Sequence, residues 1–410
     1  MSPVRTPEEI FTPKTIVTRQ MFERRNEPEL NGNPGLQDSL QDALREKGGQ
    51  VLLYGDTGVG KSSLLKYASE DERLATVTVE CLSSMGHADI LQELIRELVD
   101  IRKMTMRKDL TAGGEASVEG SVPFFTKIVG KITTGATQST EFEIVEKSAL
   151  EVITTAMKVA NKSLIVLDNF QNITDIATRM LIAQTLEQLS DRAGRLDDGY
   201  DIKCVVIGIA EDSTTLLGDS RSYGRRTTAV GVPRMPDDEI HGVLTKGFGL
   251  LGISVEPEIF EQLVFYSDGF PYFAHLLGLH VARAVRRAKV GAVEATMVDA
   301  ALDRAATAVT TTHAERIRVA YEAGGDVQPR RQILTLLANS SAREWTSADV
   351  QGLWEANLGA RDDYSFMHTA LGQLATNKYG QILKRSGPKR RYLYRFEDPH
   401  MRPYLRITLK

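Results

Sequence analysis

Residues 51–62 read VLLYGDTGVGKS, and this stretch decides the fold. Val51–Tyr54 is a short apolar run that stops at a glycine, which predicts a buried parallel strand. The eight residues that follow fit the pattern G-x(4)-G-K-[S/T] at every fixed position. Apolar residues at helical spacing then run from Ser62 to Glu70. The sequence therefore predicts a loop between a strand and a helix, a context that a chance match to the pattern would lack.

The loop contains the residue types that bind phosphate groups. Its glycines let backbone N–H groups converge on phosphate oxygens without side-chain clashes, and the amino terminus of the next helix adds partial positive charge. Lys61 is placed to reach the β- and γ-phosphates, and Ser62 to bind Mg²⁺. The predicted nucleotide-binding residues are Gly55, Asp56, Thr57, Gly58, Val59, Gly60, Lys61, Ser62 and Ser63.

A second acidic motif extends this prediction. Leu164–Leu167 is another buried strand, and Asp168 at its tip is the predicted second Mg²⁺ ligand, although a polar residue capping a strand is the alternative. The long interval after Lys61 and a separate strand at Ala75–Cys81 predict a further strand between the two motif strands. That arrangement is typical of additional-strand ATPases, and the sequence has no Asn-Lys-x-Asp guanine motif. The predicted cofactors are therefore ATP and Mg²⁺.

The remaining patterns divide the chain into parts. Strands that alternate with helices predict a doubly wound parallel sheet, an α/β fold, with a fourth strand at Cys204–Ile209. A helical pattern with one break at residues 267–271 follows. The predicted parts are an N-terminal arm and first helix at 1–48, a P-loop ATPase core at 49–236, a helical lid at 237–312, a linker at 313–328 and a winged helix at 329–410. The Gly-, Ser- and Thr-rich residues 108–143 are predicted to be a flexible insertion, either a surface loop or a partner-binding hairpin.

The C-terminal part is predicted to be a winged helix from its pattern and its charge. Three apolar helical segments lead to two strand-like segments around the turn Ser386-Gly387-Pro388. Residues 329–410 carry 14 Lys and Arg against 7 Asp and Glu, whereas the whole chain has a net charge of −4. The predicted DNA-contacting residues at the wing are Lys384, Arg385, Lys389, Arg390 and Arg391. Few base-reading groups precede them, so the predicted contact is with phosphates of any sequence, and protein docking is the alternative.

Composition excludes several other classes. The chain has 410 residues, of which 42% are hydrophobic and 25% charged, as in ordinary globular proteins. Two cysteines are too few for a disulfide framework or a four-cysteine zinc site. No apolar run approaches the length of a membrane span, and no signal-peptide pattern is visible. We therefore expect a cytoplasmic protein without a membrane partner.

Taken in order, the motifs resemble those of the AAA+ and STAND ATPases, in the branch of origin-recognition-complex-like proteins and transposition-regulator ATPases. Phe11-Thr12-Pro13 resembles the arm that packs near adenine, and Val205–Ala210 resembles the sensor-one strand. Gly269-Phe270-Pro271 resembles the Gly-x-Pro motif of the lid, which implies that Pro271 lies against the nucleotide. Ser222–Arg226 resembles the arginine-finger segment.

The resemblance implies catalytic roles for Asp168 and for Arg225 and Arg226, which would reach the γ-phosphate of a neighbouring subunit. A solvated basic turn is the alternative for the two arginines. The family usually has Glu or Asp directly after the Walker B aspartate, but Asn169 occupies this catalytic position and its amide cannot act as a base. The sensor-one strand also lacks the usual polar residue. We therefore expect slow ATP hydrolysis.

The sequence favours an ATP switch that forms homo-oligomers with nucleotide and regulates an unidentified partner protein, with nonspecific contact to double-stranded DNA. One alternative is an antiviral-defence or signalling regulator that controls an effector without binding DNA. Another is a nucleotide-binding scaffold without significant turnover. The sequence shows no metal-ligand cluster, nucleophile elbow or nuclease constellation that would name the effector.

Overall fold

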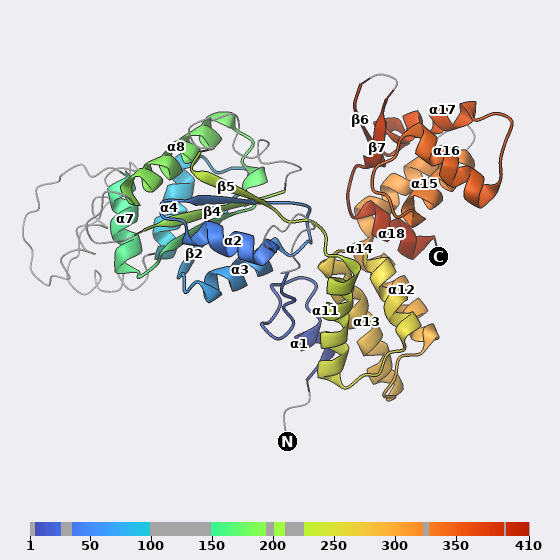
Figure 1. Ribbon diagram of the computed structural model, residues 1–410, viewed down its shortest axis with the longest axis horizontal. Coiled ribbons are helices and arrows are strands. Elements are labelled where there is room, and N and C mark those ends of the chain that lie inside the picture. The colour runs from blue at the N-terminus through green and yellow to red at the C-terminus, as the bar shows by residue number, and fades with distance from the viewer. Residues whose placement is uncertain are drawn as a thin grey trace, which may run out of the picture. The chain divides into compact units, whose positions relative to one another are not determined.

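A computed structural model of the protein describes residues 5–25, 35–98, 149–193, 201–209, 225–322, 328–388 and 391–409. The chain forms two compact units, one of Arg24–Pro233 and one of Met1–Glu23 with Arg234–Lys410 (Figure 1). The predicted insertion at 108–143 lies outside the described residues. In the described part of the chain, no helix has the length and apolarity needed to cross a lipid bilayer.

The unit of Arg24–Pro233 is built on a five-stranded parallel sheet with the order β2-β3-β4-β1-β5. Its strands are β1 (Gln50–Tyr54), β2 (Thr76–Glu80), β3 (Leu164–Asp168), β4 (Lys203–Gly208) and β5 (Thr227–Gly231). Strand β4 lies between β1 and β3, so the predicted strand between the two motif strands is confirmed. Sequence patterns did not indicate β5, because Val230 is its only buried residue.

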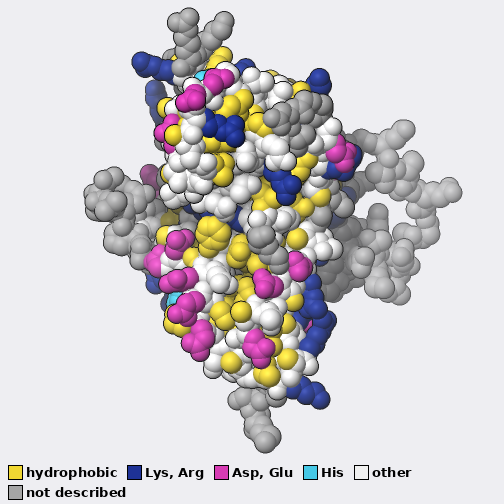
Figure 2. All heavy atoms as spheres, turned by 90° about the vertical axis from the view of Figure 1, so that its right-hand side faces the viewer, with side chains coloured by type: hydrophobic (Ala, Val, Ile, Leu, Met, Phe, Trp, Pro, Cys, Tyr) yellow, Lys and Arg dark blue, Asp and Glu magenta, His cyan; other side chains and the backbone are white. Residues whose placement is uncertain are grey.

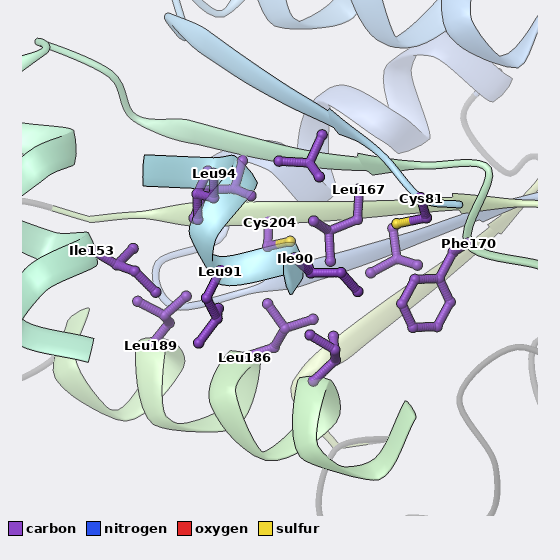
Figure 3. Close-up of a cluster of buried hydrophobic side chains, with 14 of the residues drawn as sticks. Cys81, Ile90, Leu91, Leu94, Ile153, Leu167, Phe170, Leu186, Leu189 and Cys204 are labelled. Atoms are coloured by element: carbon purple, nitrogen blue, oxygen red, sulfur yellow. The ribbon is translucent and has the colours of Figure 1, made fainter. Parts of the chain in front are cut away.

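Helices cover both faces of this sheet. Helices α2 (Leu36–Arg45) and α3 (Lys61–Asp71) lie together on one face, and α4 (His87–Leu98), α7 (Ala149–Val159) and α8 (Ile176–Ala193) lie on the other (Figure 1). A core of apolar side chains from α4, α7 and α8 packs against residues of β2, β3 and β4 (Figure 3). The predicted α/β fold with a doubly wound sheet is therefore confirmed.

The other unit starts with a short arm and a group of helices. Its elements are α1 (Pro7–Ile10), α11 (Asp237–Leu251), α12 (Pro257–Ser267), α13 (Pro271–Ala288) and α14 (Ala295–Glu322). The break predicted at residues 267–271 separates α12 from α13. The segment 1–48, predicted as one part, is divided between the units, because the arm packs on α11 and α13 whereas α2 packs on α3.

Helix α14 also differs from the prediction. It continues to Glu322 and thus takes up the first ten residues of the predicted linker at 313–328. Residues 295–322 contain neither glycine nor proline, and the first such residues are Gly324 and Gly325. Nothing in the local sequence therefore interrupts the helix before Glu322.

The C-terminal elements have the order of a winged helix. They are α15 (Gln328–Asn339), α16 (Ser347–Leu358), α17 (Ser365–Leu374), the 3₁₀ turn η2 (Asn377–Tyr379), the strands β6 (Leu383–Ser386) and β7 (Leu393–Phe396), and α18 (Met401–Thr408). β6 and β7 pair antiparallel, and Trp345 forms a bridge to Tyr394 beside them. Thr346 caps α16, because its hydroxyl accepts a hydrogen bond from the Asp349 N–H at 3.2 Å. Sequence patterns did not indicate α18 as a helix.

Candidate nucleotide-binding site

The phosphate-binding loop lies between β1 and α3, at the carboxyl edge of the sheet. Gly55 has φ +149°, and a Cβ there would lie 2.4 Å from the carbonyl oxygen of Val232. Gly60 caps α3 in the left-handed conformation, with φ +94°. Only glycine fits these two positions without strain, so the sequence pattern has a steric cause in this fold.

The Lys61 side chain folds back over the loop. Its Nζ donates hydrogen bonds to the carbonyl oxygens of Gly55 at 3.0 Å and Asp56 at 2.8 Å. Burial lowers the pKa of Lys61 from 10.5 to about 8, against the attraction of the Asp56 and Asp168 carboxylates. The ammonium group is thus partly withdrawn from water and satisfied by neutral acceptors.

Asp168 ends β3 at the same edge of the sheet, near enough for its charge to act on Lys61. Its Oδ1 accepts a hydrogen bond from the Asn169 N–H at 2.7 Å. A carboxylate and the Ser62 hydroxyl are oxygen donors of the kind that Mg²⁺ prefers, and in such sites one or two protein oxygens usually act with substrate phosphates. The donor set therefore fits Mg²⁺, which supplies charge neutralisation at the phosphates when bound.

The turn after Asp168 has a conformation that suits asparagine. Asn169 has φ +57° and an exposed side chain, and it precedes the 3₁₀ turn η1 (Phe170–Asn172). Asn and Asp adopt this left-handed conformation more readily than longer side chains do. Gln171 ties the turn to the end of β4, because its Oε1 accepts a hydrogen bond from the Ile209 N–H at 3.1 Å. A polar side chain therefore meets the end of the predicted sensor-one strand, although that strand does not supply it.

Glu80 is a residue of this edge that the sequence analysis missed. It ends β2, its Cα is the register partner of Asp168, and its side chain is exposed. The available signal was the alternation Thr76-Val77-Thr78-Val79, which makes Glu80 a polar residue at the carboxyl end of a strand. Parallel strands bring their carboxyl ends to one edge of the sheet, and this edge therefore carries two acidic residues on neighbouring strands.

The two predicted finger arginines lie at the opposite edge. Arg226 immediately precedes β5, and its carbonyl oxygen accepts a hydrogen bond from the Gln50 N–H at 2.8 Å, at the start of β1. Its guanidinium pairs with Glu187 at 2.9 Å and Asp191 at 2.7 Å, both on α8. Arg225 is exposed. The structure therefore favours Arg225 over Arg226 as a residue available to a neighbouring subunit, and residues 221–224 lie outside the described part.

Two predicted nucleotide contacts belong to the other unit. Pro271 is the buried first residue of α13, so its contact with nucleotide stays a prediction. Phe11 is buried between α11 and α13, where a Cβ on Gly247 or Gly278 would lie 2.2 or 2.4 Å from its ring. The Thr12 N–H donates a hydrogen bond to Nδ1 of His275 at 3.1 Å. Within its unit, the predicted adenine arm is thus docked on these helices.

A buried charge cluster lies at the end of α12, directly before the Gly-x-Pro motif. The Asp268 carboxylate, with an exposed side-chain fraction of 7%, meets Arg234 at 2.6 Å, Arg406 at 3.3 Å and Arg402 at 3.6 Å. Arg402 and Arg406 come from α18, so this Asp268 cluster joins the helices α11–α13 to the C-terminal helix. Burial lowers the pKa of Arg402 to about 10 and also lowers that of Arg406, while the Asp268 charge opposes both shifts.

The basic residues predicted at the wing are described in part. Lys384 and Arg385 lie on β6, and the Arg385 guanidinium lies 4.3 Å from the ring centre of Tyr392. Arg391 is exposed before β7, whereas Lys389 and Arg390 are outside the described residues. On the face of this unit seen in Figure 2, acidic side chains lie along one margin and across the middle of the helical part, and basic ones gather along the other margin. That face is therefore mixed in sign, and the wing is the better candidate for binding a polyanion.

Comparisons with known proteins agree with the geometry of the loop. Residues 35–196 match the family described as AAA ATPase domain. ORC1-type DNA replication protein 9 of Haloarcula marismortui is 32% identical over 19% of this chain and 23% of its own length, so the match spans under a quarter of that relative. Among solved structures, Cdc6p of Pyrobaculum aerophilum has a TM-score of 0.48 at 14% identity, covering 98% of this chain and 97% of that one. The ORC1 protein of Aeropyrum pernix in complex with DNA has a TM-score of 0.45 at 13% identity, covering 99% and 97%. The family match includes both the loop and Asp168, so residues 35–196 are similar to an AAA ATPase domain over the segment that contains both motifs.

Proposed function

We propose that the protein is a nucleotide-gated switch, an AAA+ ATPase that assembles with ATP and regulates a partner protein. The observation that carries this proposal is Lys61, whose ammonium group rests on two neutral carbonyl oxygens beside Asp168. A triphosphate would replace these acceptors with charged oxygens, and charge-assisted hydrogen bonds are the stronger kind. Ser62 and Asp168 are the proposed holders of Mg²⁺.

A switch suits the site better than a fast motor does. The position after Asp168 carries an amide, which cannot take a proton from water. Its left-handed backbone also disfavours a simple replacement by glutamate. We therefore expect a long-lived ATP state that ends by slow hydrolysis.

Assembly is part of the proposal because of Arg225. This residue lies at the amino edge of the sheet, whereas the phosphate-binding loop lies at the carboxyl edge. Five residues of strand β1 separate the edges, about 16 Å at 3.3 Å per residue. An exposed arginine there would serve the nucleotide of a second copy of the chain rather than its own.

The proposal also includes contact with double-stranded DNA through the wing. Similarity to an ORC1-type DNA replication protein and the basic residues of the wing both support it. Phosphate contacts release counterions, so affinity for DNA would fall steeply with salt. The scarcity of base-reading groups in α17 supports binding without sequence preference.

Calorimetry of ATP binding tests the main proposal. Lys61→Ala should weaken ATP binding at least about 100-fold, because it removes charge-assisted hydrogen bonds worth about 1.5–3 kcal/mol each. Lys66→Ala is the matched control, since Lys66 is an exposed lysine of the same helix. The control should bind ATP like the parent protein. Equal affinity of Lys61→Ala and parent would contradict the assignment of the loop.

A salt titration of double-stranded DNA binding tests the wing. Replacing Lys389, Arg390 and Arg391 with Ala should weaken binding to all sequences alike and flatten the salt slope by about one unit for each phosphate-binding side chain removed. Arg318→Ala, which removes an exposed ion-paired arginine of α14, should leave the slope unchanged. If the parent binds no DNA at low salt, the wing is a protein-docking surface; strong sequence discrimination would mean that α17 reads bases.

A further inference from the structure

At the carboxyl edge of the sheet, the residue after Asp168 cannot act as a general base, but the adjacent strand β2 ends in a carboxylate. Asn169 follows Asp168 where hydrolysis needs a group that accepts a proton. Glu80 at the end of β2 is the register partner of Asp168, and the Cys81 N–H still donates to the Asp168 carbonyl oxygen at 2.8 Å. The two strands are therefore hydrogen-bonded up to the edge, which fixes the Glu80 backbone beside Asp168.

Strand alternation decides the face on which Glu80 lies. Val77, Val79 and Cys81 are buried in the core under α4, α7 and α8, together with Ile165 and Leu167. Figure 3 shows Cys81 and Leu167 in this core. Successive side chains of a strand point to opposite faces. Glu80 and its partner Asp168 therefore share the other face of the sheet.

That other face also carries the phosphate-binding machinery. Helix α3, which begins at Lys61, packs with α2 there and contributes nothing to the core under α4, α7 and α8. The charge of Asp168 acts on Lys61, so the lysine and the aspartate are close. In-register residues of neighbouring strands are about 5 Å apart, which places Glu80 one strand beyond Asp168.

The Glu80 side chain is exposed to solvent and available for a ligand. It is exposed, and within the described ranges no hydrogen bond or ion pair holds its carboxylate. Glu187 on α8, by contrast, is fixed by Arg226, and Glu72 at the end of α3 is fixed by Arg45. A glutamate that is tied to no partner at the edge of a phosphate site is free to orient toward a bound water.

We propose that Glu80 is the catalytic base of ATP hydrolysis, in place of a carboxylate at position 169. This inference rests on the proposed ATP-binding function. The water oxygen forms a bond to the γ-phosphorus while the bond from that phosphorus to the β,γ-bridging oxygen breaks. Glu80 accepts one proton of the water, and the bridging oxygen leaves with the electron pair on ADP, so that ADP and inorganic phosphate are the products.

Single-turnover hydrolysis with the full chain in excess over radiolabelled ATP tests the proposal. Glu80→Gln should lower the hydrolysis rate about 100-fold, within the range usual for removal of a general base. ATP affinity, measured in parallel by calorimetry, should stay within about twofold, because the glutamine leaves the phosphate-binding loop intact. Glu70→Gln removes an exposed glutamate at the far end of α3 and should match the parent in both measurements.

A second variant separates a chemical role from a structural one. Asn169→Asp supplies a carboxylate that tolerates the left-handed backbone at this position. In the Glu80→Gln background it should restore the rate at least about tenfold, which repair of folding alone would not do.

The outcomes are distinguishable from failure of the proposed function. If the parent binds ATP but Glu80→Gln hydrolyses it at the parental rate, or if the parent itself never hydrolyses it, the assignment of Glu80 is wrong while nucleotide binding stands. If the parent binds no ATP, the proposed function and this inference fail together.

Discussion

Lys61 and Asp268 are both charged groups withdrawn from water, one in each unit, but they are neutralised differently. Lys61 rests on two backbone carbonyl oxygens at an edge of the sheet. Asp268 is enclosed by three guanidinium groups, and its side chain is almost fully buried. The positive charge of a cation that is hydrogen-bonded only to neutral acceptors is not neutralised, so it can still attract an anionic ligand. The negative charge of an anion surrounded by cations is already neutralised. The first arrangement suits binding, and the second suits holding helices together.

The largest expected effect on stability comes from removing the Asp268 carboxylate. Asp268→Ala should destabilise its unit by about 3–5 kcal/mol, because the buried arginines Arg402 and Arg406 would lose the carboxylate that they share. Both tryptophans of the chain, Trp345 and Trp354, are buried in this unit, so their fluorescence during urea unfolding reports on it alone. Asp238→Ala, at an exposed position of α11, is the control and should cost less than about 1 kcal/mol. Equal stability of Asp268→Ala and the parent would show that the cluster is energetically neutral.

An acid titration tests a third buried group, His275, which stays neutral in the folded unit. Burial lowers the pKa of His275 from 6.5 to about 4, and its Nδ1 accepts the Thr12 N–H. Between these pH values His275 is protonated in the unfolded chain but neutral in the folded unit. The free energy of unfolding therefore falls as pH falls from 6.5 to 4. The decrease should approach about 3 kcal/mol at 1.36 kcal/mol per pKa unit.

His275→Gln isolates this effect, because glutamine retains a hydrogen-bond acceptor and does not titrate. The difference between the parent and variant slopes of unfolding free energy against pH is the quantity to measure, since other histidines of the unit contribute equally to both. Parallel slopes would mean that His275 takes up its proton in the folded state without cost.

The smallest expected effect concerns the docked arm. Gly247→Ala should destabilise the same unit by about 1–3 kcal/mol, because the new methyl group would lie 2.2 Å from the buried Phe11 ring. Gly249→Ala lies on the same helix with no atom within 4 Å, and should stabilise it by up to about 1 kcal/mol. Phe11→Ala should abolish most of the Gly247 effect in a double-mutant cycle. Additive changes would show that the arm is not packed there in solution.

Sequence reasoning succeeded where one residue type is dictated by local geometry. Gly60 of the loop has a cause of this kind, because it caps α3 in the left-handed conformation, and the apolar strands are evident from a few consecutive residues. It failed where the cause is distant in sequence. Edge strand β5 has a single buried residue and therefore no apolar pattern. The role of the two arginines of α18 is evident only from their ion pairs with Asp268, which is far away in the sequence. Glu80 likewise gains meaning only from its register with Asp168.

Helix α14 has a mechanical consequence. Its 28 residues extend about 42 Å at 1.5 Å per residue, from the helices around the Gly-x-Pro motif to the C-terminal hydrophobic core. A continuous helix acts as a lever arm, because its hydrogen-bond ladder resists bending between the ends. If α14 tilted by about 10° at one end, the other would move by about 7 Å over that length. A small rotation among α11, α12 and α13 would therefore become a displacement of the C-terminal elements by more than one helical turn.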